Sequence, residues 1–304
     1  MKSKIFRQFY FPFVVCGMAF SSILCTTEAG EFDLKKTRAA AEGGDAAAQY
    51  AMGHAYFKGE GLPKDFKQAA DFFRKAAEQG NVEAQCDLGL MYANGQGIKL
   101  DEVEAMKWFH KAADKGDILA EYNIGWMILH GKAGSKDPKE SFPWFKKAAE
   151  AGLANAEFQI GQAYVMGDLG VEKNFTEAAK WLSKSAAQGN AAAENSLGVL
   201  YENGTGVDKD LKKAAQLYTK SAEQNNPKAQ SNLGTLYYSG KGVEQDRVKA
   251  YMWIKIGADN GEVTAAKLIE KNIFLPTHLD FTQQEMDAAK PLIIKFQAKN
   301  PPQR

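Results

Sequence analysis

The stretch AQCDLGLMYANGQGIKLDEVEAMKWFHKAADKG, residues 84–116, decides the fold, because much of the chain repeats it at a nearly constant spacing. Its clearest marker is Gly89, which follows an apolar residue. Copies of this glycine recur every 36 or 37 residues, at Gly53, Gly89, Gly125, Gly161, Gly198 and Gly234. A fixed period of this length is typical of an array of stacked repeats, each of which buries its apolar face against its neighbours.

Each unit begins with a helix, helix A. In the quoted stretch Ala84, Leu88 and Tyr92 are spaced four residues apart, so they share one apolar face of that helix. Gly89 lies inside the helix, where glycine costs about 1 kcal/mol relative to alanine. A cost that recurs in six units indicates a packing role, in which the missing side chain lets a neighbouring helix approach closely.

A loop with Gly95 and Gly97 follows, and its glycines permit the positive φ angles that a chain reversal needs. An acid or amide then precedes a second helix, helix B, as an N-cap should. These predicted N-caps are Asp65, Asp101, Asp137, Asn174, Asp210 and Asp246. The spacing of Ala105, Trp108 and Ala112 predicts the buried stripe of helix B. The counterparts of Trp108 are Phe72, Trp181, Leu217 and Trp253, and helix B ends at a glycine or at Asn225.

These motifs, A-x-x-x-L-G-x-x-Y, G-x-G-V-x-x-D and K-A-x-x-W-x-x-K-A-A-x-x-G, resemble the Sel-one-like repeat (SLR) family, a relative of the tetratricopeptide repeat. The resemblance implies an all-α fold, an α/α right-handed superhelical solenoid of antiparallel helix pairs whose A helices line a concave groove. It also implies an adaptor or scaffold. The predicted units are 45–80, 81–116, 117–152, 153–189, 190–225 and 226–261, within residues 45–262.

Capping helices are expected at both ends, since terminal repeats would otherwise expose an apolar face. Residues 30–44 form the predicted N-terminal cap and residues 263–304 the C-terminal cap and tail, in which Thr282 and Glu285 have capping-box spacing. The third unit is the least regular. Ile128 replaces the usual tyrosine, and Pro143 should kink or shorten helix B, because proline lacks the backbone donor.

Residues 1–29 are typical of a secretory signal. Lys2, Lys4 and Arg7 precede an uncharged apolar run at 9–25, and small residues at Thr27 and Ala29 predict cleavage after Ala29. The alternative is an uncleaved anchor, although the run is short for a membrane span. We therefore expect an exported protein, periplasmic or secreted if the source is a bacterium, without a stable membrane span after cleavage.

The composition argues against several functions. A formal net charge of +1 leaves no electrostatic footprint for nucleic acid. Cleavage would leave Cys86 as the single cysteine, which rules out a disulfide framework and favours a small buried side chain. The histidines show no ligand spacing, so no metal site is expected. No catalytic constellation stands out, and no enzyme activity or cofactor is predicted.

The expected binding site is the concave groove. By analogy with tetratricopeptide repeats, helix A residues three before and one after the repeat glycine face it. Tyr122, Trp126 and Phe158 could form one aromatic patch there, and Asn123 and Gln159 could hold a peptide backbone. The alternative is that Trp126 and Phe158 fill gaps in the stack. The candidate groove residues are Tyr50, His54, Leu90, Leu119, Tyr122, Asn123, Trp126, Phe158, Gln159, Gln162 and Asn195.

The sequence thus predicts an exported, non-enzymatic scaffold that binds a protein or peptide in its concave groove. Two alternatives remain open. One is a protein, or an enzyme, that holds a peptidoglycan fragment. The other is a structural subunit of an envelope assembly. A matched acid–base pair in the groove would favour an enzyme, and self-association would favour the structural subunit.

Overall fold

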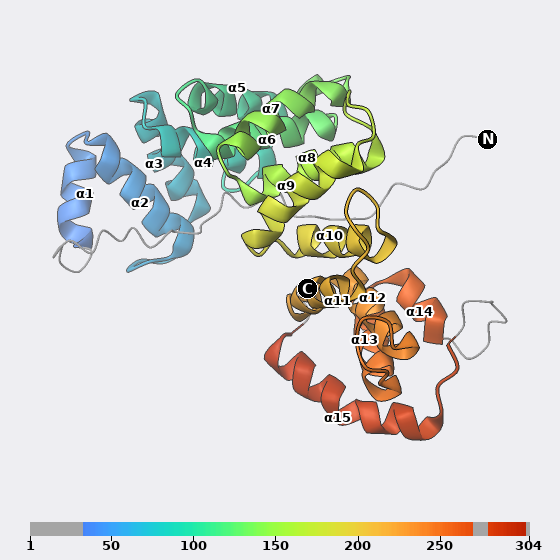
Figure 1. Ribbon diagram of the computed structural model, residues 1–304. Helices are drawn as coiled ribbons and strands as arrows, with labels where there is room; N and C mark the ends of the chain where they lie inside the picture. Colours follow the sequence, from blue (N-terminus) through green and yellow to red (C-terminus); the bar gives the residue numbers. More distant parts are fainter. Residues whose placement is uncertain (1–32, 270–278, 302–304) are drawn as a thin grey trace, which may run out of the picture. The chain divides into compact units, whose positions relative to one another are not determined.

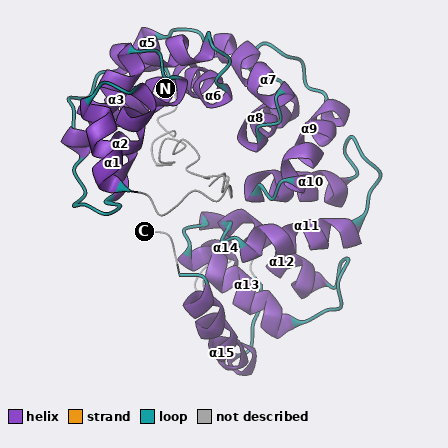
Figure 2. Ribbon diagram, turned by 90° about the vertical axis from the view of Figure 1, so that its left-hand side faces the viewer, coloured by secondary structure: helices purple, strands orange, loops and turns teal. Residues whose placement is uncertain are grey.

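The computed structural model describes residues 33–269 and 279–301, so the predicted signal segment at 1–29 lies outside the described residues. The described residues form α-helices and short 3₁₀ turns and no β-strand (Figure 2). The fold is therefore all-α, as the sequence predicts. The chain divides after Ala151 into two compact units, unit 1 up to that residue and unit 2 from Gly152 onward.

Unit 1 holds a first helix and three A–B pairs (Figure 1). Its helices are α1 Leu34–Glu42, α2 Ala46–Lys58, α3 Phe66–Glu78, α4 Val82–Asn94, α5 Glu102–Ala113, α6 Ile118–Leu129 and α7 Ser141–Glu150, with 3₁₀ turns η1 Lys132–Gly134 and η2 Pro138–Glu140. The A helices are α2, α4 and α6, and each packs most closely against the B helix that follows it. Helix α1 packs on α2, where Gln49 Nε2 donates to the Ala41 carbonyl at 3.2 Å.

Unit 2 repeats the arrangement. Its helices are α8 Ala154–Met166, α9 Phe175–Ala187, α10 Ala191–Asn203, α11 Leu211–Glu223, α12 Pro227–Ser239, α13 Arg247–Asp259, α14 Val263–Ile269 and α15 Gln283–Lys299. Helix α15 covers α13, and the ring centroids of Phe296 and Trp253 lie 5.0 Å apart. The predicted capping box of Thr282 and Glu285 opens α15, and Arg247 of α13 pairs with the same glutamate.

The repeat glycine has the packing role that the sequence predicts, and the structure identifies its partner. A Cβ atom on Gly89 would lie only 2.7 Å from Cε1 of Phe109, in helix B of the same repeat. The ring therefore fills the space that the glycine leaves. The same relation joins Gly53 to Phe73, Gly125 to Phe145, Gly161 to Leu182, Gly198 to Tyr218 and Gly234 to Ile254.

The buried stripe of helix B differs by one residue from the predicted one. Trp108 is buried, with 6% of its surface exposed, but the fully buried ring is its neighbour Phe109 at 0%. The counterparts Phe72, Trp181 and Leu217 are only half-buried. Adjacent residues of a helix are 100° apart, and both lie near the face that meets helix A, so the close approach at the glycine decides which of them is enclosed.

Loop glycines join successive repeats. A Cβ atom on Gly97 would lie 2.1 Å from the carbonyl oxygen of Phe66, at the start of the preceding helix B. Gly206 and Gly242 meet the backbones of Phe175 and Leu211 in the same way. All three adopt positive φ angles of 68° to 73°. Each loop therefore rests directly on the backbone of the repeat before it, where no side chain fits.

The loop of the third repeat contacts the preceding repeat in a different way. A Cβ atom on its loop glycine, Gly134, would have no neighbouring atom within 4 Å. Glu102 of α5 instead accepts hydrogen bonds from Lys132 Nζ at 2.7 Å and from the Ala133 amide at 3.2 Å. Lys132 is also the main reason that the pKa of Glu102 lies below its ordinary value. As predicted, helix B is shortened here. Helix α7 has 10 residues, and Pro143 stands in its first turn, where no backbone donor is needed.

The predicted N-caps are confirmed in five repeats. Asp101 accepts a hydrogen bond from the Glu104 amide at the start of α5, and Asp65, Asn174, Asp210 and Asp246 cap their helices likewise. Asp137 instead caps the 3₁₀ turn η2, and α7 begins after it without a side-chain cap. Asn225 takes the left-handed conformation, with a φ of 63°, that glycine has at the other helix B ends. These local signals fix where each helix begins and ends, and so where the repeats can stack.

A buried polar side chain four residues before each repeat glycine ties helix A to helix B. Gln230 shows the full pattern: its Nε2 donates to the Ala222 carbonyl at 3.1 Å, and its Oε1 accepts from Asn260 at 3.0 Å. Three repeats carry glutamate at this position. Glu194 accepts from Gln224 at 2.9 Å, but its carboxylate has no hydrogen to donate to a carbonyl.

We expect Glu194→Gln to stabilise the protein by about 1 kcal/mol at pH 7, because the new amide can donate to the Ala186 carbonyl as Gln230 does to Ala222. Burial is the main reason that the pKa of Glu194 is raised. The native state therefore binds its proton more readily than the unfolded state, and the wild type loses stability as the pH rises through the raised pKa. Urea unfolding at pH 7 and pH 4 measures the effect.

The advantage of Glu194→Gln should shrink at pH 4, where the wild-type carboxyl is also neutral. The reverse change in the last repeat, Gln230→Glu, serves as the control and should destabilise more at pH 7 than at pH 4. A gain for Glu194→Gln that is the same at both pH values would show that buried charge is not its cause.

Candidate functional site

The candidate site is the row of A-helix residues three before, two before and one after each repeat glycine, here called the inner row. Side chains of this row meet between neighbouring A helices of one unit. Tyr50 donates to Asp87 Oδ2 at 3.2 Å, Asn123 Nδ2 approaches Cys86 Sγ at 4.0 Å, and Asn232 Nδ2 donates to Asn195 Oδ1 at 3.0 Å. Each pair is 37 residues apart, so the inner row runs along the side where A helices adjoin.

In unit 1 the inner row is more deeply buried than the sequence suggests. Tyr122 and Asn123 are only 3% and 4% exposed, and the Tyr122 ring packs against Phe145 with a centroid distance of 5.5 Å. His54 and Leu90 are also buried. The Tyr122 ring thus belongs to the interior of its repeat, which differs from the exposed ring expected. The candidate residues of unit 1 that keep more exposed surface are Tyr50, Leu119 and Trp126.

Trp126 combines packing and exposure. Its indole packs against the core cluster that includes Leu90 and Ile124, and it is half-buried. The imidazole of His130 stacks on it, with ring centroids 3.9 Å apart and an interplanar angle of 21°. His130 Nδ1 also lies 2.8 Å from the Trp126 carbonyl oxygen. The indole is therefore held in one orientation on the inner row of unit 1.

Burial shifts the pKa of two ionisable groups, one on the inner row and one beside it, toward their neutral forms. The pKa of His54 is lowered, mainly by burial and then by Lys58, against the opposing effect of Glu60. The pKa of Asp117, the N-cap of α6, is raised mainly by burial, although the Ala120 amide and the Cys86 thiol donate hydrogen bonds that oppose the shift.

In unit 2 the inner row carries no charge at any described position. Phe158, Gln159 and Gln162 are half-buried, and Asn195 is 8% exposed. The other members are Ser196, Val199, Ser231, Asn232 and Thr235. Phe158 packs against the core cluster of Leu182 and Leu197. Because Phe158 belongs to unit 2, whereas Tyr122 and Trp126 belong to unit 1, the predicted patch of three rings stays a prediction.

Sequence reasoning missed Asp87 and Asn232, which pair with candidate residues of the preceding repeat. The spacing of these residues was the signal that could have revealed the pairs. Each stands one repeat plus one residue after its partner, and that spacing recurs along the array. Helical periodicity within one helix does not reveal such contacts, because they join helices of different repeats.

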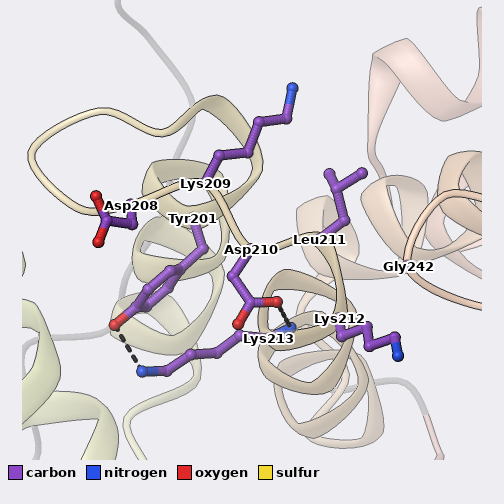
Figure 3. A pocket seen from close by; sticks show the side chains of 8 residues that line it. All are labelled: Tyr201, Asp208, Lys209, Asp210, Leu211, Lys212, Lys213 and Gly242. Carbon is purple, nitrogen blue, oxygen red and sulfur yellow. Dashed lines mark hydrogen bonds between the residues drawn. The ribbon is translucent and has the colours of Figure 1, made fainter.

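A surface cavity of about 590 Å³ lies in unit 2, beside the loop that precedes α11 (Figure 3). Its polar groups are used locally: Lys213 Nζ donates to the Tyr201 hydroxyl at 2.6 Å, and Asp210 caps α11 by accepting from the Lys213 amide at 2.9 Å. Lys209 and Lys212 point in different directions (Figure 3). The cavity therefore does not gather charge toward one ligand.

The described residues contain neither a metal-binding cluster nor a membrane-spanning helix. Within residues 33–269 and 279–301, no group of three or more His, Cys, Asp or Glu side chains could hold a metal ion. Over the same ranges, no helix is both long and apolar enough to cross a membrane.

The repeats match the family model of the Sel1 repeat at residues 46–81, 82–117, 118–153, 154–190, 191–226 and 227–262. A similar solved structure is c5321, a protective antigen of uropathogenic Escherichia coli strains with an SLR fold, at 34% identity and a TM-score of 0.72. The match covers 88% of this chain but only 58% of that one. A Sel1 repeat protein from Oxalobacter formigenes matches at 34% identity and a TM-score of 0.64, over 70% of this chain and 85% of that one. A comparison with curated protein sequences gives no match.

Proposed function

The chain belongs to the Sel1 repeat family, and we propose that it is an exported, non-enzymatic adaptor that binds a protein or peptide along its inner row. Sel1 repeat proteins generally mediate protein–protein interaction. The observation that carries the proposal is the make-up of the inner row. Within unit 1 it holds a rigidly oriented, half-buried indole at Trp126. Within unit 2 it presents uncharged amides such as Gln159 and Gln162.

This make-up suits a polypeptide ligand. Half-buried aromatic rings bind apolar side chains with little loss of conformational entropy, and they often dominate an interface. Primary amides both donate and accept, as a peptide backbone requires. The packing of each repeat centres on the contact between the repeat glycine and helix B, to which some inner-row rings also contribute, as Tyr122 does by packing on Phe145.

Trp126→Ala tests this role. We expect the variant to lose capture of a partner from the native envelope fraction, by about 2 kcal/mol or more in binding free energy, because a central aromatic contact is removed. Trp144→Ala is the matched control, since Trp144 is a half-buried tryptophan on helix B of the same repeat. Pull-down and thermal melting are measured on both variants.

The control should capture the partner normally, and Trp126→Ala should melt close to the wild type. If Trp126→Ala unfolds the array, the indole is a core residue that fills a gap in the stack. If it melts normally and still captures the partner, the inner row does not bind at this position.

Export rests on the charged start at Lys2, Lys4 and Arg7, the apolar run at 9–25 and the small residues Thr27 and Ala29. We expect the mature protein to begin at Gly30. N-terminal sequencing of protein recovered from outside the cytoplasm measures this directly. A mature pool that still begins at Met1 would contradict cleavage.

A further inference from the structure

We propose that Asn195 and Asn232 form a subsite that binds one peptide group of an extended, uncharged stretch of the partner, an inference that rests on the proposed function. The two side chains come from neighbouring A helices, α10 and α12, and Asn232 Nδ2 donates to Asn195 Oδ1 at 3.0 Å. Among the pairs of the inner row described above, this one joins two primary amides.

The hydrogen-bonding capacity of the pair is only partly used. A primary amide has two donor hydrogens and an acceptor oxygen. The bond between the two asparagines uses one donor of Asn232 and one acceptor site of Asn195. Within the described part of the chain, Asn195 Nδ2 donates to no protein group and Asn232 Oδ1 accepts from none. The pair therefore presents a donor and an acceptor, which complement the C=O and the N–H of a peptide backbone.

The free donor of the pair is accessible to a ligand, although Asn195 as a whole is only 8% exposed. Asn195 Nδ2 is not among the fully buried polar atoms of the described residues without a partner, so it keeps some contact with solvent. A bound carbonyl oxygen would replace water at this donor. Asn232 is half-buried and stands beside it, which leaves the pair reachable from the inner row.

The absence of charge selects the kind of ligand. The other members of the inner row in unit 2 are Phe158, Gln159, Gln162, Ser196, Val199, Ser231 and Thr235, all uncharged. A basic ligand group would lose hydration there and meet no countercharge in the row. Lys228, which is exposed one turn before Asn232 on α12, is the charge on that face of the helix. A neutral backbone amide loses less hydration and can form both of its hydrogen bonds, so the chemistry favours an uncharged extended segment over a basic one.

The test starts from a phage-displayed library of linear peptides panned on the purified full chain. The affinity of the tightest peptide is then measured for the wild type, Asn195→Ser and Asn232→Ser. Serine is a conservative choice, since Ser231 and Ser196 occupy the equivalent positions in neighbouring repeats. Gln216→Ser, at an exposed amide on α11, is the matched control.

Each asparagine variant should bind about fivefold more weakly, the effect of losing one neutral hydrogen bond, while the control stays unchanged. Single backbone N–H groups of the peptide are then replaced by ester oxygens. One of these replacements should weaken binding to the wild type but not to Asn232→Ser, because that variant lacks the amide oxygen that accepts the hydrogen bond. All variants must keep the wild-type circular dichroism spectrum.

Binding within twofold of the wild type for both asparagine variants, with a peptide that does bind, would overturn the subsite and leave the proposed function standing. A library that yields no binding peptide would overturn the proposed function itself, and the subsite with it. The two failures are therefore distinguishable.

Discussion

Phe109→Ala should lower the free energy of unfolding by about 3–5 kcal/mol, the usual cost of deleting a fully buried phenyl ring. Phe109 is 0% exposed, and its ring occupies the space opposite Gly89. Helix A has no side chain there that could move in to fill the cavity, because the facing residue is glycine. The site should therefore relax little, which places the cost in the upper part of the range for such substitutions.

Phe72→Ala is the control, because Phe72 also lies in helix B but is half-buried and stacks on Tyr56 at 5.7 Å. We expect it to cost clearly less than Phe109→Ala. Urea unfolding followed by circular dichroism measures both. Equal losses for the two variants would mean that the contact between the glycine and helix B does not organise the repeat.

Gly97→Ala should cost roughly 2–5 kcal/mol, because it combines two unfavourable effects. The residue has a φ of 68°, a left-handed conformation that costs an alanine about 1–2 kcal/mol. Its new Cβ would also lie 2.1 Å from the carbonyl oxygen of Phe66, so the loop must move away from the preceding repeat. Overpacking of this kind typically costs about 1–3 kcal/mol.

Gly134→Ala separates the two effects. Gly134 has a φ of 81° and no neighbour within 4 Å of a Cβ atom, so this substitution carries only the conformational cost. The difference in unfolding free energy between the two variants therefore measures the contact between repeats. Should the two variants prove equally stable, the loop glycine would not be what joins one repeat to the next.

Much of the fold could be predicted from the sequence because its signals are local and repeated. The period, the N-caps such as Asp101 and the left-handed residue Asn225 each depend on a few neighbouring residues. The packing role of Gly89 could be inferred from the free-energy cost of a glycine inside a helix. The identity of its partner did not, because Trp108 and Phe109 are adjacent, and helical periodicity does not separate adjacent positions when both are aromatic.

The candidate site could be predicted less well, because it depends on contacts between repeats. The sequence placed Tyr122 on the inner row but could not show that its ring packs against Phe145. The pairing of Asn195 with Asn232 depends on the register of two neighbouring A helices. The repeat pattern also does not predict the effect of a different residue at one position of one repeat. Lys115 stands where repeats one and five have Gln79 and Gln224, and the buried Gln85 Oε1 is left without a hydrogen bond among the described residues.

Site-specific photo-crosslinking shows most directly whether the inner row contacts the partner. A benzophenone side chain replaces Gln162 or Trp126 on the inner row, and Gln216 or Trp144 on B helices as controls. The full-length protein is irradiated in its native cells, and adducts are identified by mass spectrometry. We expect one recurrent partner that is crosslinked from the inner-row positions and absent from the controls. Adducts that form from the B-helix positions and not from the inner row would contradict binding along this row.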